Sequence, residues 1–306
     1  MKPIDCVIIP ARGGSKRIKH KNMQPFCGTP MLERSIETAK IVSEYVIVSS
    51  DDLEILEFSK LKGAYPLLRD EVLADDITPT LPVIRHSLMP FLDEAAKDFV
   101  AKLEVKNSQN IKDLPKDSTL NNGTNKIESK KEDSKKTYNQ QVPKDKKEFK
   151  DSFNEETQRK AYNDMIANIP LQISLHSKVL CLYATAMFAT KDIILESCAM
   201  LDKNQPDEKV AYIVSIIEAG KVFRSFTRND CGFLQFMFPQ FMNTRSQDLP
   251  QSFFDAGQFY LGFAKSFLAQ IPLLGQKSIG ITLQHAHDID TMLDLQIAES
   301  LFKNIN

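Results

Sequence analysis

A short apolar stretch that runs directly into a cationic, glycine-containing loop limits the possible folds of this chain more than any other feature. Cys6 to Ile9 are apolar throughout and fit a buried strand. Gly13 and Gly14 follow and allow the backbone to turn and to approach a ligand closely. Cationic side chains surround the same turn, namely Arg12, Lys16, Arg17 and Lys21. Because such a loop suits a polyphosphate, we expect a nucleoside triphosphate as ligand.

The spacing within this loop differs from the two common nucleotide-binding loops. A Walker loop requires a lysine and a serine or threonine directly after its second glycine, and a dinucleotide fingerprint requires three glycines as G-x-G-x-x-G. Neither pattern occurs in the sequence. ATP binding of the Walker type and NAD binding are therefore disfavoured. A solvated basic loop after a strand is the alternative interpretation.

Composition excludes several other classes of protein. The 306 residues carry a net charge of -1, which gives no overall reason to expect a nucleic-acid or membrane partner. The 5 cysteines are odd in number and form no C-x-x-C pair, so neither a disulfide framework nor a zinc site is expected. Because we find neither a signal peptide nor an apolar run long enough to span a bilayer, we expect a cytoplasmic protein.

Strand and helix patterns alternate through the first part of the chain, which favours βαβ units and a parallel sheet. The expected strands are 6–11, 45–50 and 64–68, and the expected helices are 31–42, 53–62 and 81–96. Ligands of such sheets bind at the carboxyl ends of the strands. The cationic loop follows the first strand, so its position agrees with its chemistry.

Residues 97–165 are dominated by polar and charged side chains, with few aliphatic ones. We expect this insertion to be disordered or loosely helical, because it has little apolar surface to bury. A basic arm for nucleic acid or anionic lipid is the less favoured alternative, since lysines and acidic residues are interspersed. The remaining segments, 1–96 and 176–306, are expected to form one domain.

Regular structure returns with a continuous apolar run at 178–185, which fits a central strand. Further strands are expected at 212–216, within 253–263 and at 278–283, and helices at 191–201 and 290–303. The irregular, aromatic-rich stretch 220–255 interrupts the alternation. We expect it to project from the core and to carry a dimer contact.

Asp288 and Asp290 place two carboxylates two residues apart, with Ile289 between them. In extended backbone both carboxylates lie on one side while the isoleucine faces the core. Such a pair suits Mg²⁺, which takes one or two carboxylates and completes its shell with water and phosphate oxygens. The alternative interpretation is that Asp290 caps the terminal helix and that Asp288 is merely exposed.

Arg69 and Thr80 are further candidates for nucleotide contacts. The guanidinium of Arg69 can donate to a pyrimidine carbonyl, and the hydroxyl of Thr80 can donate to ribose or phosphate. Arg69 could instead pair with Asp70 or Glu71 at the surface. Asp51, at the end of the second expected strand, lies at the edge where a ligand would bind, or it caps the helix that follows.

These segments resemble the cytidylyltransferases that activate sialic and related nonulosonic acids. The loop matches their A-R-x-x-S-K-R-x-x-x-K-N signature, residues 68–80 are similar to their L-R-P-x-x-L-A block, and 288–290 match their D-I-D. The resemblance covers about residues 4–96 and 176–303. It implies a Rossmann-like α/β fold of the nucleotide-sugar cytidylyltransferase type, with a mostly parallel sheet, a small dimerisation projection and a long disordered insertion.

Two departures from the sialic acid pattern point to one branch of the family. The family's R-P-N-G-A-I-Y block is replaced by residues 254–260, F-D-A-G-Q-F-Y, and its L-Q-P-T-S-P strand end by residues 182–187, L-Y-A-T-A-M. With the segments around Arg224 and Arg245, this pattern looks like the pseudaminic acid cytidylyltransferase branch, which supplies sugar for surface glycans such as those on flagellin.

The resemblance implies a role for each candidate residue. Phosphate-holding catalytic residues would be Arg12, Lys16 and Lys21; nucleotide-binding residues Ala11, Ser15, Asn22, Arg69 and Thr80; sugar-binding residues Tyr183, Arg224 and Arg245; and Mg²⁺ ligands Asp288 and Asp290. The substrates would be CTP and a nine-carbon 2-keto sugar acid, and the enzyme a homodimer. The alternatives are the same chemistry on legionaminate, neuraminate or an octulosonate, and a non-catalytic nucleotide-binding scaffold. No residue stands out as the general base.

Overall fold

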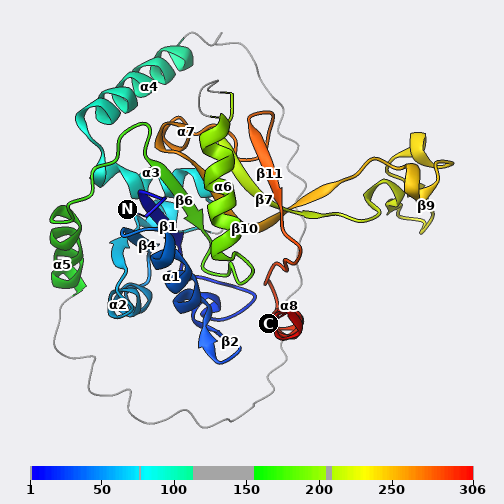
Figure 1. Ribbon diagram of the computed structural model, residues 1–306, viewed down its shortest axis with the longest axis horizontal. Coiled ribbons are helices and arrows are strands. Elements are labelled where there is room, and N and C mark those ends of the chain that lie inside the picture. Colours follow the sequence, from blue (N-terminus) through cyan, green and yellow to red (C-terminus); the bar gives the residue numbers. More distant parts are fainter. Residues whose placement is uncertain (1, 76, 113–154, 205–208, 306) are drawn as a thin grey trace.

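A seven-stranded sheet in the order β11-β7-β10-β6-β1-β4-β5 forms the centre of the molecule (Figure 1). The computed structural model describes residues 2–75, 77–112, 155–204 and 209–305. The strands are β1 (Cys6–Pro10), β4 (Val46–Ser50), β5 (Tyr65–Leu68), β6 (Lys178–Leu182), β7 (Tyr212–Glu218), β10 (Phe253–Phe263) and β11 (Ser278–Thr282). All of them were expected from the sequence, with ends that differ by a few residues.

The sheet is mostly parallel, as predicted. β1 runs parallel to both of its neighbours, with Ile8 opposite Ile47 of β4 and Cys181 of β6. β10 is antiparallel to β6 and to β7, whereas β7 and β11 are parallel. The carboxyl ends of β1, β4, β5, β6, β7 and β11 therefore meet at one edge, where the amino end of β10 also lies.

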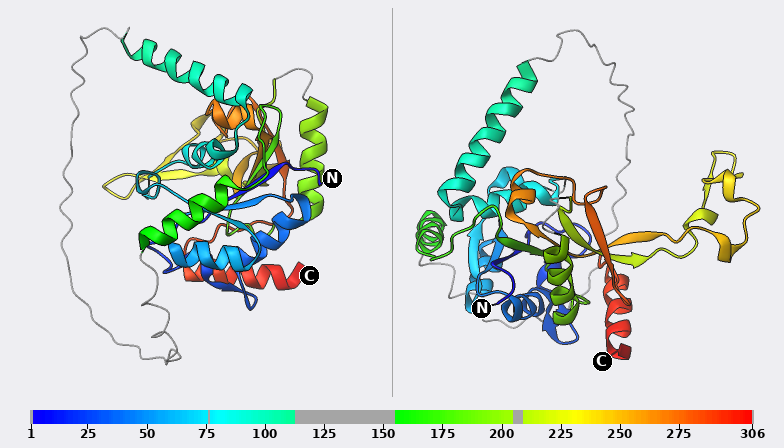
Figure 2. Two further views of the ribbon diagram at one scale, coloured as in Figure 1. Left: turned by 90° about the vertical axis from the view of Figure 1, so that its left-hand side faces the viewer. Right: turned by 45° about the horizontal axis from the view of Figure 1, so that its top comes forward.

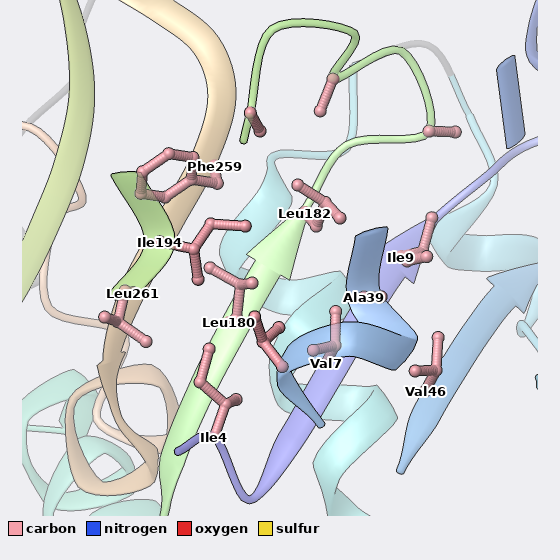
Figure 3. Packing of buried hydrophobic residues seen from close by; sticks show 14 of the residues in the cluster. Ile4, Val7, Ile9, Ala39, Val46, Leu180, Leu182, Ile194, Phe259 and Leu261 are labelled. Atoms are coloured by element: carbon pink, nitrogen blue, oxygen red, sulfur yellow. The ribbon is translucent and has the colours of Figure 1, made fainter. Parts of the chain in front are cut away.

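Helices cover both faces of the sheet, which explains why the central strands are mostly apolar on both faces. Val7 and Ile9 of β1 face the cluster completed by α1 (Met31–Val42), α2 (Leu53–Leu61) and α6 (Lys191–Asn204). Figure 3 shows this cluster, in which Leu180 and Leu182 of β6 lie between the β1 side chains and those of Ile194 and Phe259. Cys6 and Ile8 face the opposite cluster, which includes α3 (Thr80–Leu88) and α7 (Ala264–Leu268).

The single helix expected over 81–96 is wrong, because the chain forms two helices with a turn between them. α3 ends at Leu88, a short 3-10 helix η3 (Met89–Phe91) follows, and α4 (Glu94–Lys112) begins in a new direction. Pro90 lies in this turn, and Asp93 caps the new helix by accepting a 2.8 Å hydrogen bond from the Ala96 amide.

The two described ends of the polar insertion are helical and contact the core. α4 and α5 (Glu155–Ala167) include Val100, Tyr162 and Ile166, whose side chains are 3%, 6% and 6% exposed. The helical alternative for this insertion thus agrees with both stretches, but their contact with the core was not expected, because these few apolar residues were overlooked among the charges. Residues 113–154 of the predicted insertion lie outside the described residues.

Residues 220–255 project from the sheet, as expected. Their stem is formed by the outer parts of β7 and β10, where Phe253 pairs with Glu218 (Figures 1 and 2). A small hairpin of β8 (Phe226–Arg228) and β9 (Leu234–Phe236) lies at its end. The projection exposes several large apolar side chains, including Phe233, Leu234 and Phe254. Their role in a dimer contact stays a prediction.

The C-terminal helix α8 (Met292–Ile305) packs beside the small hairpin of β2 (Pro25–Phe26) and β3 (Thr29–Pro30). Phe26 and Phe302 meet edge to face with ring centroids 5.2 Å apart, and the Cys27 amide donates to Glu299. The start of α8 is two residues later than predicted. Within the described residues, no helix combines the length and the apolarity that crossing a bilayer requires.

Substitution of Gly262 tests the packing between β10 and the chain at the start of β7. A Cβ added there would lie 2.6 Å from the Ala211 carbonyl oxygen and 2.7 Å from the Tyr212 ring, so Gly262→Ala overpacks the sheet. We expect urea denaturation to show a loss of about 1–3 kcal/mol in the free energy of unfolding. Gly275→Ala, whose Cβ would meet nothing within 4 Å, is the control, and equal stabilities of the two variants would contradict the packing.

Candidate active site

Two adjoining clefts lie at the carboxyl edge of the sheet, and both are lined by Arg12, Lys21 and Asn22. The larger cleft has a volume of about 500 Å³ and the smaller about 350 Å³. Among the predicted site residues, the larger cleft adds Arg69, Thr80, Tyr183 and Asp288, and the smaller adds Ser15, Lys16 and Asp290. The structure thus brings most of the predicted residues together, although they come from five separate segments of the chain.

The start of the cationic loop is fixed to the end of β4. The Ala11 amide donates to the Ser49 carbonyl at 2.9 Å, and the Gly13 amide donates to the Asp51 carboxylate at 3.0 Å. A Cβ on Gly13 would lie 2.6 Å from the Cβ of Asp52, so this position requires glycine. Asp51 therefore anchors the loop, and the helix cap of α2 is its neighbour Asp52, which accepts from the Glu54 amide at 2.8 Å.

The far end of the loop is fixed by Asn22. This side chain is 9% exposed, and its Nδ2 donates to the Arg12 carbonyl at 2.9 Å, which ties the two ends of the loop together. His20, just before it, adopts a left-handed backbone conformation with φ of 51°. The loop is consequently a closed structure in which the cationic side chains face a common space.

Asp288 and Asp290 flank the fully buried Ile289, as the alternation predicted. Asp288 is exposed in the larger cleft, and Asp290 is half-buried in the smaller one. Asp290 is paired with Arg17 at 2.8 Å and with Lys21 at 3.2 Å. Through these contacts, the predicted metal-binding pair lies directly beside the cationic loop.

The alternative in which Asp290 caps the terminal helix is wrong. The cap is Thr291, whose hydroxyl accepts from the Asp294 amide at 3.2 Å, while the Asp294 carboxylate accepts from the Thr291 amide at 2.7 Å. This is a reciprocal capping box. Hydrogen bonds from Thr291 lower the pKa of Asp294. Asp290 only donates its backbone amide to this box, so its carboxylate is available for other contacts.

The carboxylate pair fits a divalent cation that takes most of its ligands from elsewhere. Within the described residues no group of three or more histidine, cysteine, aspartate or glutamate side chains could hold a metal ion. Mg²⁺ differs from zinc in needing only one or two carboxylates, with phosphate oxygens and water filling its octahedral shell. Asp288 and Asp290, beside a loop that suits phosphates, meet this requirement.

Arg69 is buried instead of paired at the surface. Its side chain donates to the Ser49 carbonyl at 2.7 Å and to the Ser49 hydroxyl at 3.3 Å, and Asp70 instead contacts His86. Burial lowers the pKa of Arg69 to about 10, and the negative charge of Asp51 opposes this shift. The guanidinium therefore remains protonated at neutral pH at the wall of the larger cleft.

Tyr183 and Tyr260 form a second polar wall of the larger cleft. The Tyr183 hydroxyl lies 2.6 Å from the Thr80 hydroxyl, the two tyrosine rings meet edge to face, and the Tyr260 hydroxyl donates to Asp255. Burial raises the pKa of both phenols well above the ordinary value, so both stay protonated as donors.

An irregularity in β10 brings Asp255 into this wall. The register against β7 shifts between Asp255 and Tyr260, and Gly257 has φ of 60°. Such bulges re-aim side chains beside sites. Sequence reasoning noted residues 254–260 only as a departure from a family pattern. The signal that could have located them is the glycine beside a polar residue inside this aromatic-rich strand.

Three predicted residues are placed differently from the rest. The side chain of Ala11 is fully buried in the core, so only its backbone is near the clefts. Arg224 and Arg245 lie on the projection, and neither is among the described residues that line the two clefts. Arg224 donates to the carbonyls of Met242 and Thr244, which holds the projection together. Their predicted contact with a sugar stays a prediction.

Comparison with known proteins shows what the chain is similar to. Residues 6–110 match the family model of the cytidylyltransferases. The chain is 27% identical to the pseudaminic acid cytidylyltransferase of Campylobacter jejuni over 301 residues, which are 97% of this chain and 95% of that protein. It is 38% identical to the N-acylneuraminate cytidylyltransferase of Escherichia coli over 88 residues, 28% of this chain and 21% of that protein.

A solved structure has the same fold. It is that of a CMP:2-keto-3-deoxy-manno-octonic acid synthetase complexed with CTP, which superposes with a TM-score of 0.50 at 11% identity and covers 98% of this chain and 99% of that one. Cytidylyltransferases of this kind generally use a divalent metal ion. The chain thus resembles the cytidylyltransferases that activate sialic and related acids, and its likeness to the pseudaminic acid enzyme extends over nearly its whole length.

Proposed function

We propose that this chain transfers CMP from CTP to the anomeric hydroxyl of pseudaminic acid and releases pyrophosphate. The observation that carries the reaction is the meeting of the cationic loop with the carboxylates of Asp288 and Asp290 at one edge of the sheet. The observation that favours this acid is the extent of the likeness. It spans nearly the whole chain for the pseudaminic acid enzyme, but less than a third of it for the neuraminate enzyme.

The smaller cleft is the proposed triphosphate site. Arg12, Lys16 and Lys21 supply positive charge around it, and the hydroxyl of Ser15 and the backbone of the loop supply neutral donors. In the reaction, the oxygen of the sugar hydroxyl forms a bond to the α-phosphorus and gives its proton to solvent, while the bond from that phosphorus to the bridging oxygen of pyrophosphate breaks. Because the charge is spread over phosphate oxygens in such a transfer, fixed cations lower the barrier mainly by electrostatic stabilisation and positioning.

Asp288 and Asp290 would hold Mg²⁺, which would neutralise phosphate charge when it is bound. The chain's own contribution is to keep the two carboxylates at a fixed place. Ile289 is fully buried between them, and the capping box of α8 follows directly. Neither the burial of Ile289 nor the capping box uses a carboxylate of the pair.

The larger cleft is the proposed site of the nucleoside and the acceptor. Arg69 and Thr80 lie in the same cleft as Asn22 and offer donors for cytosine and ribose, with Arg69 held in place by Ser49. Tyr183 and Asp255 offer a donor and an acceptor for the hydroxyl and amide groups of a sugar acid. Whether ordered water completes these contacts does not affect the assignment of the cleft.

The proposal also covers dimerisation through the projection, the domain organisation and the cellular location of the enzyme. Residues 220–255 would form a homodimer through their exposed apolar side chains, and Arg224 and Arg245 would meet the carboxylate of an acceptor only in such an assembly. Segments 1–96 and 176–306 would act as one catalytic domain, with 97–165 as an insertion. The enzyme would act in the cytoplasm and supply activated sugar for bacterial surface glycans, including those of flagellin.

Turnover with a panel of sugar acids tests the proposed reaction. Purified protein is incubated with CTP, Mg²⁺ and, separately, pseudaminate, legionaminate, N-acetylneuraminate and an octulosonate, and pyrophosphate release is followed. We expect the greatest kcat/KM with pseudaminate, by roughly 10-fold or more, because polar sites discriminate strongly among hydroxyl and amide patterns. A higher kcat/KM with another acid would identify that acid as the acceptor. If no pyrophosphate is released with any of the four acids, the proposed enzymatic activity is refuted.

Replacement of Asp290 tests its role as a metal ligand. We expect Asp290→Asn to reduce metal-dependent turnover on the order of 100-fold or more, because a metal's stabilisation of phosphate charge amounts to several kcal/mol. Asp202→Asn is the control, since it removes one carboxylate from an exposed ion pair with Lys178 that lies outside both clefts. It should leave turnover nearly unchanged. Full activity of Asp290→Asn would remove the carboxylate from the mechanism.

A further inference from the structure

Both carboxylate oxygens of Asp290 are already engaged by cations of the loop. Arg17 Nη1 lies 2.8 Å from Oδ2, and Lys21 Nζ lies 3.2 Å from Oδ1. In the proposed function, however, this carboxylate must give at least one oxygen to a metal ion. A divalent cation that approached these contacts would also be repelled by the two positive charges beside them. In the nucleotide-free protein, the Asp290 carboxylate is thus occupied by Arg17 and Lys21 and is not open to a metal ion.

The contact between Arg17 and Asp290 follows from the packing of their neighbours. Ile18 is 2% exposed and Ile289 is fully buried, and both belong to one apolar cluster with Phe26, Met187 and Leu295. Because the residue beside each buried isoleucine is directed to the surface, Arg17 and Asp290 are brought together where the two segments meet. The packing of the fold therefore places the two partners of this ion pair side by side, although they are far apart in sequence.

The same pair is weak enough to be exchanged. The Arg17 side chain is 66% exposed and that of Asp290 is 31% exposed, and ion pairs of such exposure contribute little to stability. Arg17 also lines the smaller cleft with Lys16 and Ser15, where the triphosphate is proposed to lie. A triphosphate carries more negative charge than one carboxylate and offers the guanidinium bidentate acceptors.

We propose that Arg17 is a positioning residue that exchanges Asp290 for the triphosphate, so that nucleotide binding uncovers the metal ligand. Without nucleotide, Arg17 holds Asp290 and disfavours metal binding there. With nucleotide, Arg17 binds phosphate and Asp290 is released to the metal. The inference rests on the proposed function, because it requires that CTP occupies the smaller cleft.

The proposal predicts effects of opposite sign from one substitution. Arg17→Ala should bind Mn²⁺ more tightly than the unchanged protein in the absence of nucleotide, by about 3-fold, because the competing cation is gone. It should bind CTP more weakly in the presence of EDTA, by about 5-fold, because a phosphate contact is gone. Free Mn²⁺ measured by electron paramagnetic resonance gives the first affinity, and isothermal titration calorimetry gives the second.

Lys19→Ala is the matched control, since it removes one positive charge from an exposed position of the same loop. At about 0.15 M salt, where charges about 8 Å apart are already strongly screened, it should change both affinities by less than about 1.5-fold. Asp290→Asn should weaken the Mn²⁺ affinity and thereby show that the ion measured is the one at this carboxylate.

Three results would overturn the exchange: an unchanged Mn²⁺ affinity in Arg17→Ala, affinities for Mn²⁺ and CTP that both fall, or equal effects in Lys19→Ala. Failure of the proposed function has a different signature, since the unchanged protein would then not bind CTP or would release no pyrophosphate. If CTP binds but Arg17→Ala shows no effects of opposite sign, only the exchange is refuted.

Discussion

The burial of Ile18 and Ile289 in one apolar cluster is the contact on which the site depends. One isoleucine lies in the cationic loop near the start of the chain and the other between the two aspartates near its end, and α8 completes the cluster with Leu295 and Ala298. Loss of a large buried aliphatic side chain costs about 2–5 kcal/mol, which is far more than the exposed ion pairs above it can contribute. Apolar packing therefore sets the position, and the charged residues then use it.

Because apolar packing fixes the positions of the charged residues, the site can be stable before a ligand binds. The loop is anchored by neutral and charge-assisted hydrogen bonds, from Gly13 to Asp51 and from Asn22 to Arg12. Its cations meet Asp290 when phosphate is absent. In the free protein, Asp290 thus neutralises part of the positive charge of the loop. A bound triphosphate would neutralise this charge instead, and a bound metal would take the place of the cations beside Asp290.

Much of this arrangement follows from the sequence, because periodicity and loop chemistry are local. The alternation of strands and helices predicted the parallel sheet, and the rule that parallel strands bind ligands at their carboxyl ends placed the loop at that edge. The loop was linked to Asp288 and Asp290 by the chemistry of Mg²⁺ with phosphate and by the family resemblance. The sequence could not reveal that Asp51 holds Gly13, that Arg17 meets Asp290, or that the bulge at Gly257 turns Asp255 into the cleft. These depend on register and on contacts between distant segments. The contact of the insertion's helical ends with the core was missed because three buried side chains, Val100, Tyr162 and Ile166, are spread among many charged ones.

The central claim is that the loop and the Asp288/Asp290 pair act on one ligand, and a crystal structure of the protein with CTP and Mn²⁺ tests it most directly. Anomalous diffraction at the manganese edge locates the metal independently of the nucleotide density. We expect one anomalous peak within coordination distance of a carboxylate oxygen of the pair and of the triphosphate, with the phosphates against Arg12, Lys16 and Lys21 and the cytosine toward Arg69. A nucleotide bound away from these residues, or a metal with no contact to either aspartate, would contradict the account.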